Sequence, residues 1–164
     1  MMKLEEAVEA LAPGVLRYCM AVTGDRALAE DVSQDALTAL VDRWKRLGAP
    51  DSVDAFVFSV ARRRAARALA KRRLLAPIRR FRNGHSADPR PDERAAERQR
   101  LERTMAAMGS LSPRERQALQ LVVVGGLSSK EAATLLRTSE GALKMRLHRA
   151  RKRLSELLEE RDDR

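Results

Sequence analysis

The chain has 164 residues, which suits one ordinary domain or two small ones. It holds 33 Lys and Arg against 23 Asp and Glu, a formal net charge of +10 that attracts polyanions, with nucleic acid as the first candidate and an acidic membrane surface as the second. An apolar content of 44% excludes a wholly disordered chain. Cys19 is the only cysteine, which excludes an internal disulfide and a cysteine-cluster metal site.

Helix-forming residues dominate the sequence. Ala, Leu, Arg and Glu are frequent, aromatic residues make up 3%, and no stretch alternates β-branched with polar residues. We therefore predict an all-α fold. The N-terminal segment MMKLEEAVEALAPG carries acids where a signal peptide needs an apolar core, and no apolar run is long enough to span a membrane. These features predict a cytoplasmic protein without membrane insertion.

The first part of the chain, 1–76, is expected to form a small helical domain. Its first helix covers 3–22 and is bent or interrupted at Pro13. A second helix runs from 25 to 47, and a third from 51 to 73. The N-cap candidates of the second and third helices are Asp25 and either Asp51 or Ser52.

The segment 77–93 reads PIRRFRNGHSADPRPDE, with three prolines, an Asn-Gly turn pair and no helical apolar stripe. It predicts a flexible linker to a second helical domain, 94–164. In this domain we expect helices over 93–108, 113–124, 129–137 and 139–160. Their start signals are the capping boxes Ser112–Glu115 and Ser128–Glu131, and Thr138 or Ser139 as the last N-cap.

The helices expected over 129–137 and 139–160 have the spacing of a helix-turn-helix, whose second helix enters the DNA major groove. One face of the longer helix is apolar and consists of Leu143, Leu147, Ala150, Leu154 and Leu157. The candidate DNA-reading side consists of Ser139, Gly141, Lys144, Met145, His148, Arg149 and Lys152. Cations there can bind phosphates, and long donors can reach base edges. A solvated basic face is the alternative, but the coincidence of capping box, turn and partner helix favours DNA binding.

Several motifs in the two halves point to one family. In the C-terminal half they cover 111–116, 126–128, 131–133 and 143–151, and in the N-terminal half they cover 23–25, 29–35, Trp44 and 56–62. In this order they resemble region 4 and region 2 of the extracytoplasmic-function sigma factors, which are promoter-specificity subunits of bacterial RNA polymerase. The resemblance implies a subunit that binds core RNA polymerase and promoter DNA, has no catalytic residues, cofactor or metal of its own, and is held inactive by an anti-sigma factor.

In the family, an Asp-x-x-Gln-Glu stretch docks on the clamp helices of the largest polymerase subunit. The matching residues here are Asp31, Gln34 and Asp35. Asp31 and Asp35 form an acidic stripe with Thr38 and Asp42, which would repel phosphate and therefore suits a protein partner with cations. The alternative is an ordinary solvated face. The other side of this helix is apolar, with Leu28, Val32, Leu40 and Trp44.

In the family, the third helix and the loop before it, here 48–54, recognise and open the promoter −10 element. The candidate DNA-binding residues are Arg62, Arg63, Arg64, Arg67, Lys71 and Arg72. The sequence departs from the family pattern, because Arg63 and Arg67 stand at a usual Asn and Asp, and Phe56 at a usual Trp. Met145 likewise replaces a small Ser on the −35-reading helix. These changes predict general strand affinity on the −10 side and an unusual −35 sequence.

The altered −10 segment motivates a second hypothesis, a sigma-derived DNA-binding regulator or companion subunit that does not itself melt promoters. An enzyme ranks third, because there is no P-loop, Gly-x-Ser-x-Gly or His-Glu-x-x-His motif, and His85 and His148 lack catalytic partners. For Cys19, a core position is favoured over a redox sensor because its neighbours in the sequence are apolar.

Overall fold

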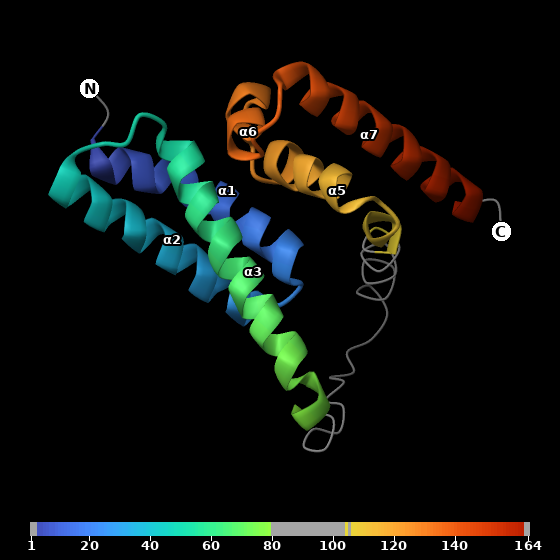
Figure 1. Ribbon diagram of the computed structural model, residues 1–164, viewed down its shortest axis with the longest axis horizontal. Helices are drawn as coiled ribbons and strands as arrows, with labels where there is room; N and C mark the ends of the chain where they lie inside the picture. The colour runs from blue at the N-terminus through green and yellow to red at the C-terminus, as the bar shows by residue number, and fades with distance from the viewer. Residues whose placement is uncertain (1–2, 80–103, 105, 163–164) are drawn as a thin grey trace.

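The computed structural model describes residues 3–79, 104 and 106–162, and these residues form helices and turns without a strand (Figure 1). The prediction of an all-α fold is confirmed. The elements are α1 (Leu4–Thr23), α2 (Arg26–Leu47), α3 (Val53–Arg79), α5 (Pro113–Leu119), η1 (Gln120–Val124), α6 (Ser129–Leu135) and α7 (Glu140–Asp162).

In the N-terminal half, α1, α2 and α3 pack on one another, and local signals set where they begin. The Asp25 carboxylate caps α2, since its Oδ1 accepts a hydrogen bond from the Leu28 N–H at 2.8 Å. At α3 the cap is Ser52, whose Oγ accepts from the Ala55 N–H at 3.2 Å. Helix α1 is continuous through Pro13, so the interruption that the proline suggested does not occur.

In the C-terminal half, too, the helices begin at the N-caps that the sequence predicted. Both predicted capping boxes form, Ser112 with Glu115 before α5 and Ser128 with Glu131 before α6. Ser139 caps α7, because its Oγ accepts from the backbone N–H one turn further on, at 3.1 Å. The helix expected over 113–124 changes character midway, because its last turn, η1, is a π-helix, which the sequence did not predict.

The segment between the halves is only partly described. Helix α3 extends to Arg79, so the first residues of the predicted linker are helical. The rest of 77–93, and most of the helix predicted over 93–108, lie outside the described residues, although 106–109 are helical. The domain bounds therefore stay a prediction.

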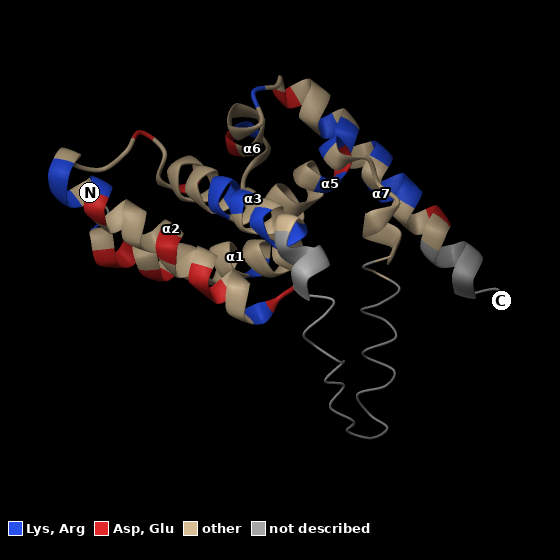
Figure 2. Cartoon of the chain, turned by 60° about the horizontal axis from the view of Figure 1, so that its bottom comes forward, with Lys and Arg blue, Asp and Glu red and all other residues tan. Residues whose placement is uncertain are grey.

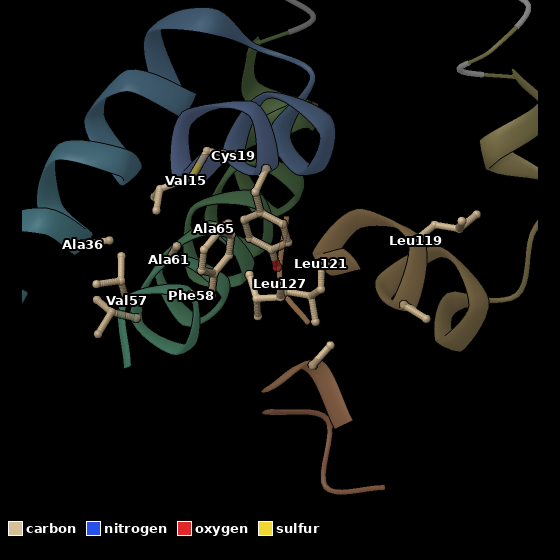
Figure 3. Packing of buried hydrophobic residues seen from close by; sticks show 14 of the residues in the cluster. Val15, Cys19, Ala36, Val57, Phe58, Ala61, Ala65, Leu119, Leu121 and Leu127 are labelled. Carbon is tan, nitrogen blue, oxygen red and sulfur yellow. The ribbon is translucent and has the colours of Figure 1, made fainter. Parts of the chain in front are cut away.

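One cluster of buried apolar residues runs through both halves of the molecule. In the N-terminal half, the Tyr18 and Phe58 rings meet edge to face with centroids 5.4 Å apart. Leu121 and Leu127 project toward Phe58 from the C-terminal half, and all four side chains are buried (Figure 3). The sequence predicted two domains, but it did not predict that they pack against each other.

Candidate polymerase and nucleic-acid interfaces

The acidic stripe lies on the outer side of α2. Asp31, Gln34 and Asp35 are all exposed, whereas Val32 and Leu40 on the other side are buried. Figure 2 shows acidic residues along α2 and basic residues along α3 and α7. The helix therefore presents carboxylates to solvent while its apolar side is buried against its neighbours.

Asp35 is not isolated from the basic helix. Its Oδ2 accepts a hydrogen bond from Arg64 Nη1 of α3, and both side chains are about half exposed. A residue predicted to bind polymerase and a residue predicted to bind DNA are thus partners in one ion pair. Asp31 and Gln34 lie on the same exposed face of α2.

The basic residues of α3 fall into two groups. Arg63, Arg67 and Lys71, which follow one another at steps of four residues, are exposed and line one face of the helix. Arg62 and Arg72 are only partly exposed.

Each of these two arginines interacts with a partner inside the N-terminal half. Arg72 Nη1 donates to Asp25 Oδ2 at 2.9 Å, so it binds the residue that caps α2. Arg62 lies close enough to Tyr18 to lower the pKa of its phenol, although burial acts more strongly and raises that pKa well above its usual value. We conclude that part of the charge on α3 stabilises the fold.

A hollow of about 820 Å³ lies between α2 and α3. Five arginines line it, together with Asp42 and the Phe56 ring; they are Arg43, Arg46, Arg63, Arg64 and Arg67. Guanidinium groups bind phosphate oxygens in a fork geometry, and an aromatic ring gives a base a surface on which to stack. This arrangement suits a single nucleic-acid strand.

Two of these arginines were missed by sequence reasoning. Arg43 and Arg46 belong to the last turns of α2, and Arg43 Nη1 donates to the Gly48 carbonyl oxygen at 2.7 Å, which places it beside the loop 48–54. The signal was available as the basic run that surrounds Trp44. Without the fold, this run predicts only the end of a helix.

The loop before α3 also faces the C-terminal half. A second hollow, of about 540 Å³, is lined on one side by 51–55 and on the other by residues at the start of α6, among them Ser128, Lys130 and Glu131. Burial raises the pKa of the Asp54 carboxyl here, and the nearby Glu131 carboxylate raises it further. The part of the chain expected to read the −10 element is therefore in a partly shielded position.

Helices α6 and α7 form the predicted helix-turn-helix. Helix α6 ends at Leu135, two residues before the predicted end, and Arg137 turns the chain with a φ of 51°. The Thr138 N–H donates to the Ala133 carbonyl oxygen at 3.0 Å and closes the turn. The predicted apolar stripe of α7 is confirmed, since Leu143, Leu147 and Ala150 are buried.

The candidate DNA-reading side of α7 is open to solvent. All seven predicted residues are exposed: Ser139, Gly141, Lys144, Met145, His148, Arg149 and Lys152. Two of the cations pair with acids one turn away on the same helix, Lys144 with Glu140 at 2.7 Å and Lys152 with Glu156 at 3.9 Å. Such exposed pairs are weak and leave the cations available to phosphates. Met145 presents an apolar side chain, 52% exposed, amid these charges.

Within 3–79, 104 and 106–162, no three His, Cys, Asp or Glu side chains converge as metal ligands would. No helix in the same ranges combines the length and the apolarity that crossing a membrane requires. Cys19 is fully buried, and burial raises the pKa of its thiol to about 11, which keeps the thiol protonated in the core.

Comparison with known families gives two matches, one in each half. Residues 7–74 match the family described as Sigma-70 region 2, and residues 101–154 match the family described as Sigma-70, region 4. Both folded halves of the chain are thereby covered, in the order that the motifs indicated.

Curated relatives match along nearly the whole chain. The ECF RNA polymerase sigma factor SigD of Mycobacterium tuberculosis is 32% identical over 162 residues, covering 93% of this chain and 76% of the relative. The RNA polymerase sigma-E factor of Streptomyces antibioticus is 30% identical over 162 residues, covering 98% and 87%.

Two solved structures share the fold. One is the sigma factor RpoE in complex with the anti-sigma factor NepR from Bartonella quintana, with a TM-score of 0.68, 22% identity and coverage of 94% of this chain and 96% of that one. The other is CnrH in complex with the cytosolic domain of CnrY, with a TM-score of 0.67, 22% identity and coverage of 95% and 87%.

Proposed function

Since the chain belongs to the extracytoplasmic-function sigma factors of bacterial RNA polymerase, we propose that it binds the core polymerase and directs initiation at a specific set of promoters. Sigma factors are specificity subunits, and in this proposal the chain supplies no catalytic chemistry of its own. It places two DNA-binding surfaces on one promoter, through α3 for the −10 element and α7 for the −35 element.

The observation that carries the proposal is the separation of charge over the surface. A chain with a net charge of +10 keeps an exposed acidic face on α2, with Asp31 and Asp35, while its basic residues gather on α3 and α7 (Figure 2). The acidic face would repel DNA, so it suits a cationic protein surface. We assign Asp31, Gln34 and Asp35 to the polymerase.

The hollow between α2 and α3 supports a role for this half in binding the −10 strand. Its arginines can hold successive phosphates, and Phe56 can stack on a base. Arg43 and Arg46 join Arg63, Arg64 and Arg67 in this role. The open side of α7 gives the −35 element a helix that fits the major groove, with Met145 able to contact a thymine methyl group.

Run-off transcription with core polymerase and genomic templates tests the function, and charge reversal tests the polymerase site. Asp31→Lys should weaken core binding by about tenfold or more, since reversing a charge in a complementary interface adds repulsion to the lost attraction. Glu9→Lys on α1 makes the same change in charge at another exposed acid and should leave core binding unaltered. If Asp31→Lys binds the core as the wild type does, the polymerase site lies elsewhere.

The basic replacements Arg63 and Arg67 favour a second candidate, a sigma-derived regulator that binds DNA or polymerase without opening promoters. Permanganate footprinting on the bound promoter separates the two, because a true sigma factor makes thymines near the start site reactive. If only Arg63→Asn/Arg67→Asp, which restores the family residues, opens the promoter, the regulator is the better description.

We further propose an anti-sigma factor as a partner, in keeping with the complexes in which both related structures were solved. Such a partner would co-purify with the tagged chain and abolish run-off transcription when added back. A co-purifying protein without effect on transcription would not be that partner.

A further inference from the structure

The short connection between α6 and α7, residues 136–139, is the turn of the helix-turn-helix (Figure 1), and we call it the α6–α7 turn. The Thr138 N–H donates to the Ala133 carbonyl oxygen at 3.0 Å, and the Arg137 N–H donates to the Thr134 carbonyl oxygen at 3.2 Å. These two bonds close the last turn of α6 in the Schellman pattern, which needs a left-handed residue directly after the helix C-cap. That residue is Arg137, with a φ of 51°.

An arginine is an unusual residue at such a position. The Cβ of an L-residue crowds the backbone in the left-handed region, so glycine is the usual residue there. Among the residues that the structure describes, the others with a positive φ are all glycines: Gly24, Gly48 and Gly126, at 64°, 75° and 83°. The backbone is therefore strained at Arg137, and strain that persists in a fold is a reason to look for a function of the side chain.

The Arg137 side chain is not used to hold the fold together. It is exposed, and within 3–79, 104 and 106–162 no carboxylate forms an ion pair with it, whereas Arg64 and Arg72 of α3 each bind an acid. A cation at the C-terminal end of a helix is favourable in itself. However, a basic residue in the last turn of α6 would supply the same charge without the strain. A local role thus does not explain why the left-handed residue is an arginine.

The way a helix-turn-helix docks places its turn close to the DNA backbone. The second helix enters the major groove with its N-terminal residues toward the base edges, while the first helix crosses the phosphate backbone. The turn that joins the two helices therefore lies at the edge of the groove, beside the phosphates. Arg137 stands two residues before Ser139, which caps α7 and begins the candidate DNA-reading side. From this position a guanidinium group can donate two hydrogen bonds to one phosphate.

An acid at the start of α7 increases the need for positive charge on the turn. Glu140 follows the N-cap and is exposed. A hydrogen bond from Lys144, together with its charge, holds the pKa of the Glu140 carboxyl below 4.5, so the group is ionised at neutral pH and repels a phosphate. Lys144 neutralises part of this charge, and Arg137 adds a cation on the turn itself.

We propose that Arg137 binds a phosphate of the DNA duplex, and that the chain keeps a strained arginine on the α6–α7 turn, in place of a more stable glycine, for the sake of this contact. The ligand is a phosphodiester oxygen, which carries no base information, so Arg137 positions α7 in the groove and does not read the sequence. The contact rests on the proposed DNA-binding function of α7, whereas the strain does not.

Three substitutions of Arg137 separate its charge from its backbone conformation. Arg137→Gly removes both the charge and the strain, so the thermal midpoint should rise by about 2 to 4 °C. Arg137→Asn removes the charge but keeps a side chain that tolerates the left-handed region. Arg137→Lys keeps the charge and the strain, and its thermal midpoint should equal that of the wild type. The matched control is Arg114→Asn, which removes an exposed cation from α5 in the same half of the chain.

Fluorescence anisotropy of the full chain on two duplexes of unrelated sequence measures the contact. Two sequences are used because a phosphate contact should contribute equally to both. Arg137→Gly and Arg137→Asn should bind each duplex about fivefold or more weakly than the wild type, with the slope of log K against log salt reduced by about 1. Arg137→Lys and Arg114→Asn should stay within about twofold of the wild-type affinity. Far-UV circular dichroism checks that each variant keeps its helices.

Each part of the proposal has a result that overturns it. The phosphate contact is wrong if Arg137→Gly binds as the wild type does, if Arg114→Asn loses as much affinity, or if Arg137→Asn keeps its affinity, because the loss would then come from a more flexible turn. The strain is wrong if the thermal midpoint of Arg137→Gly stays the same or falls, since Arg137 would then stabilise the end of α6. If the wild type itself binds neither duplex, the proposed function of α7 fails together with the contact, and the thermal midpoints still decide the strain.

Discussion

The two basic helices of this protein use their cations differently. On α3, Arg64 and Arg72 bind the acids Asp35 and Asp25 from the α2 side of the domain, through contacts 29 and 47 residues apart in sequence. Arg62 is half-buried toward Tyr18. The cations of this helix thus stabilise the tertiary structure and can also bind a ligand.

On α7, packing against the domain and contact with a ligand are assigned to opposite faces of the helix. Leu143, Leu147 and Ala150 hold the helix to its domain, while Lys144 and Lys152 pair with Glu140 and Glu156 on the same helix. Counting basic residues would rank the two helices as equal. Their contacts predict instead that substitutions on α7 affect DNA binding alone, whereas those on α3 affect DNA binding and stability in different proportions.

The largest effect is expected on α7. Lys144→Ala/Lys152→Ala should lower affinity for an upstream promoter duplex by about tenfold or more and reduce the slope of log K against log salt by about 2. Both side chains are well exposed, at 64% and 71%, so the thermal midpoint should not move. Fluorescence anisotropy at several salt concentrations measures both quantities. Arg114→Ala, an exposed cation on α5, is the control, and an equal loss there would mean that the binding face is not on α7.

Two substitutions on α3 separate its role in fold stability from its role in binding a nucleic-acid strand. Arg72→Ala removes a partner of the α2 cap and should lower the free energy of unfolding by up to about 1 kcal/mol, with little change in strand affinity. Arg67→Ala should do the reverse, weakening single-strand binding about threefold and leaving stability within about 0.5 kcal/mol. Urea unfolding and oligonucleotide anisotropy measure the two. If both variants bind more weakly by the same factor and neither is destabilised, the cations of α3 serve DNA binding alone, as those of α7 do, and the contrast between the two helices is wrong.

The features predictable from the sequence are those with short-range causes. Asp25, Ser112 and Ser128 cap helices because each carries its acceptor beside the N–H groups that need it. The stripe that begins with Leu143 is buried because its spacing matches the helical repeat. The helix-turn-helix follows from such signals in series, and so did the candidate residues on its exposed side.

The features that could not be predicted depend on contacts between distant segments. Nothing in the local sequence of Arg72 distinguishes it from Arg67, because the difference is set by where Asp25 lies after folding. The five-arginine hollow likewise needs the end of α2 to lie beside the middle of α3. The packing of the two halves depends on the close approach of Gly14 to the carbonyl oxygen of Gly125, whereas a glycine inside a helix predicts locally only a loss of helix stability.

The Asp35–Arg64 ion pair tests whether the proposed polymerase-binding surface on α2 affects the proposed DNA-binding surface on α3. Asp35→Asn should weaken core binding and, by releasing Arg64, raise affinity for a single strand by at most about threefold. A double-mutant cycle with Arg64→Ala should give a coupling of about 0.2 to 1 kcal/mol in strand binding, because both side chains are half exposed. A coupling of zero would show that the pair does not restrain Arg64, and the two surfaces would then act independently.

The smallest expected effect concerns Glu115, an acid near which two arginines of α7 lie. The Ser112 side chain and backbone hold the pKa of Glu115 below its ordinary 4.5, and Arg153 and Arg149 lower it further. A lowered carboxyl pKa stabilises the fold above about pH 4.5, and this contribution is lost as the pH falls through the folded-state pKa. Glu115→Gln can keep the capping hydrogen bonds without titrating, so its thermal midpoint should fall less than that of the wild type between pH 5 and pH 3.

The difference should be about a degree or two, because Glu115 is close to solvent. Salt separates its two causes, since screening weakens the attraction of the arginines but leaves the short hydrogen bond from Ser112. If high salt removes most of the acid-dependent difference between Glu115→Gln and the wild type, Arg149 and Arg153 also stabilise the domain. In that event the cations of both helices stabilise the fold, and α3 and α7 differ only in how much they do so. If salt has no effect, the cap alone lowers the pKa of Glu115, and the arginines of α7 remain free for DNA.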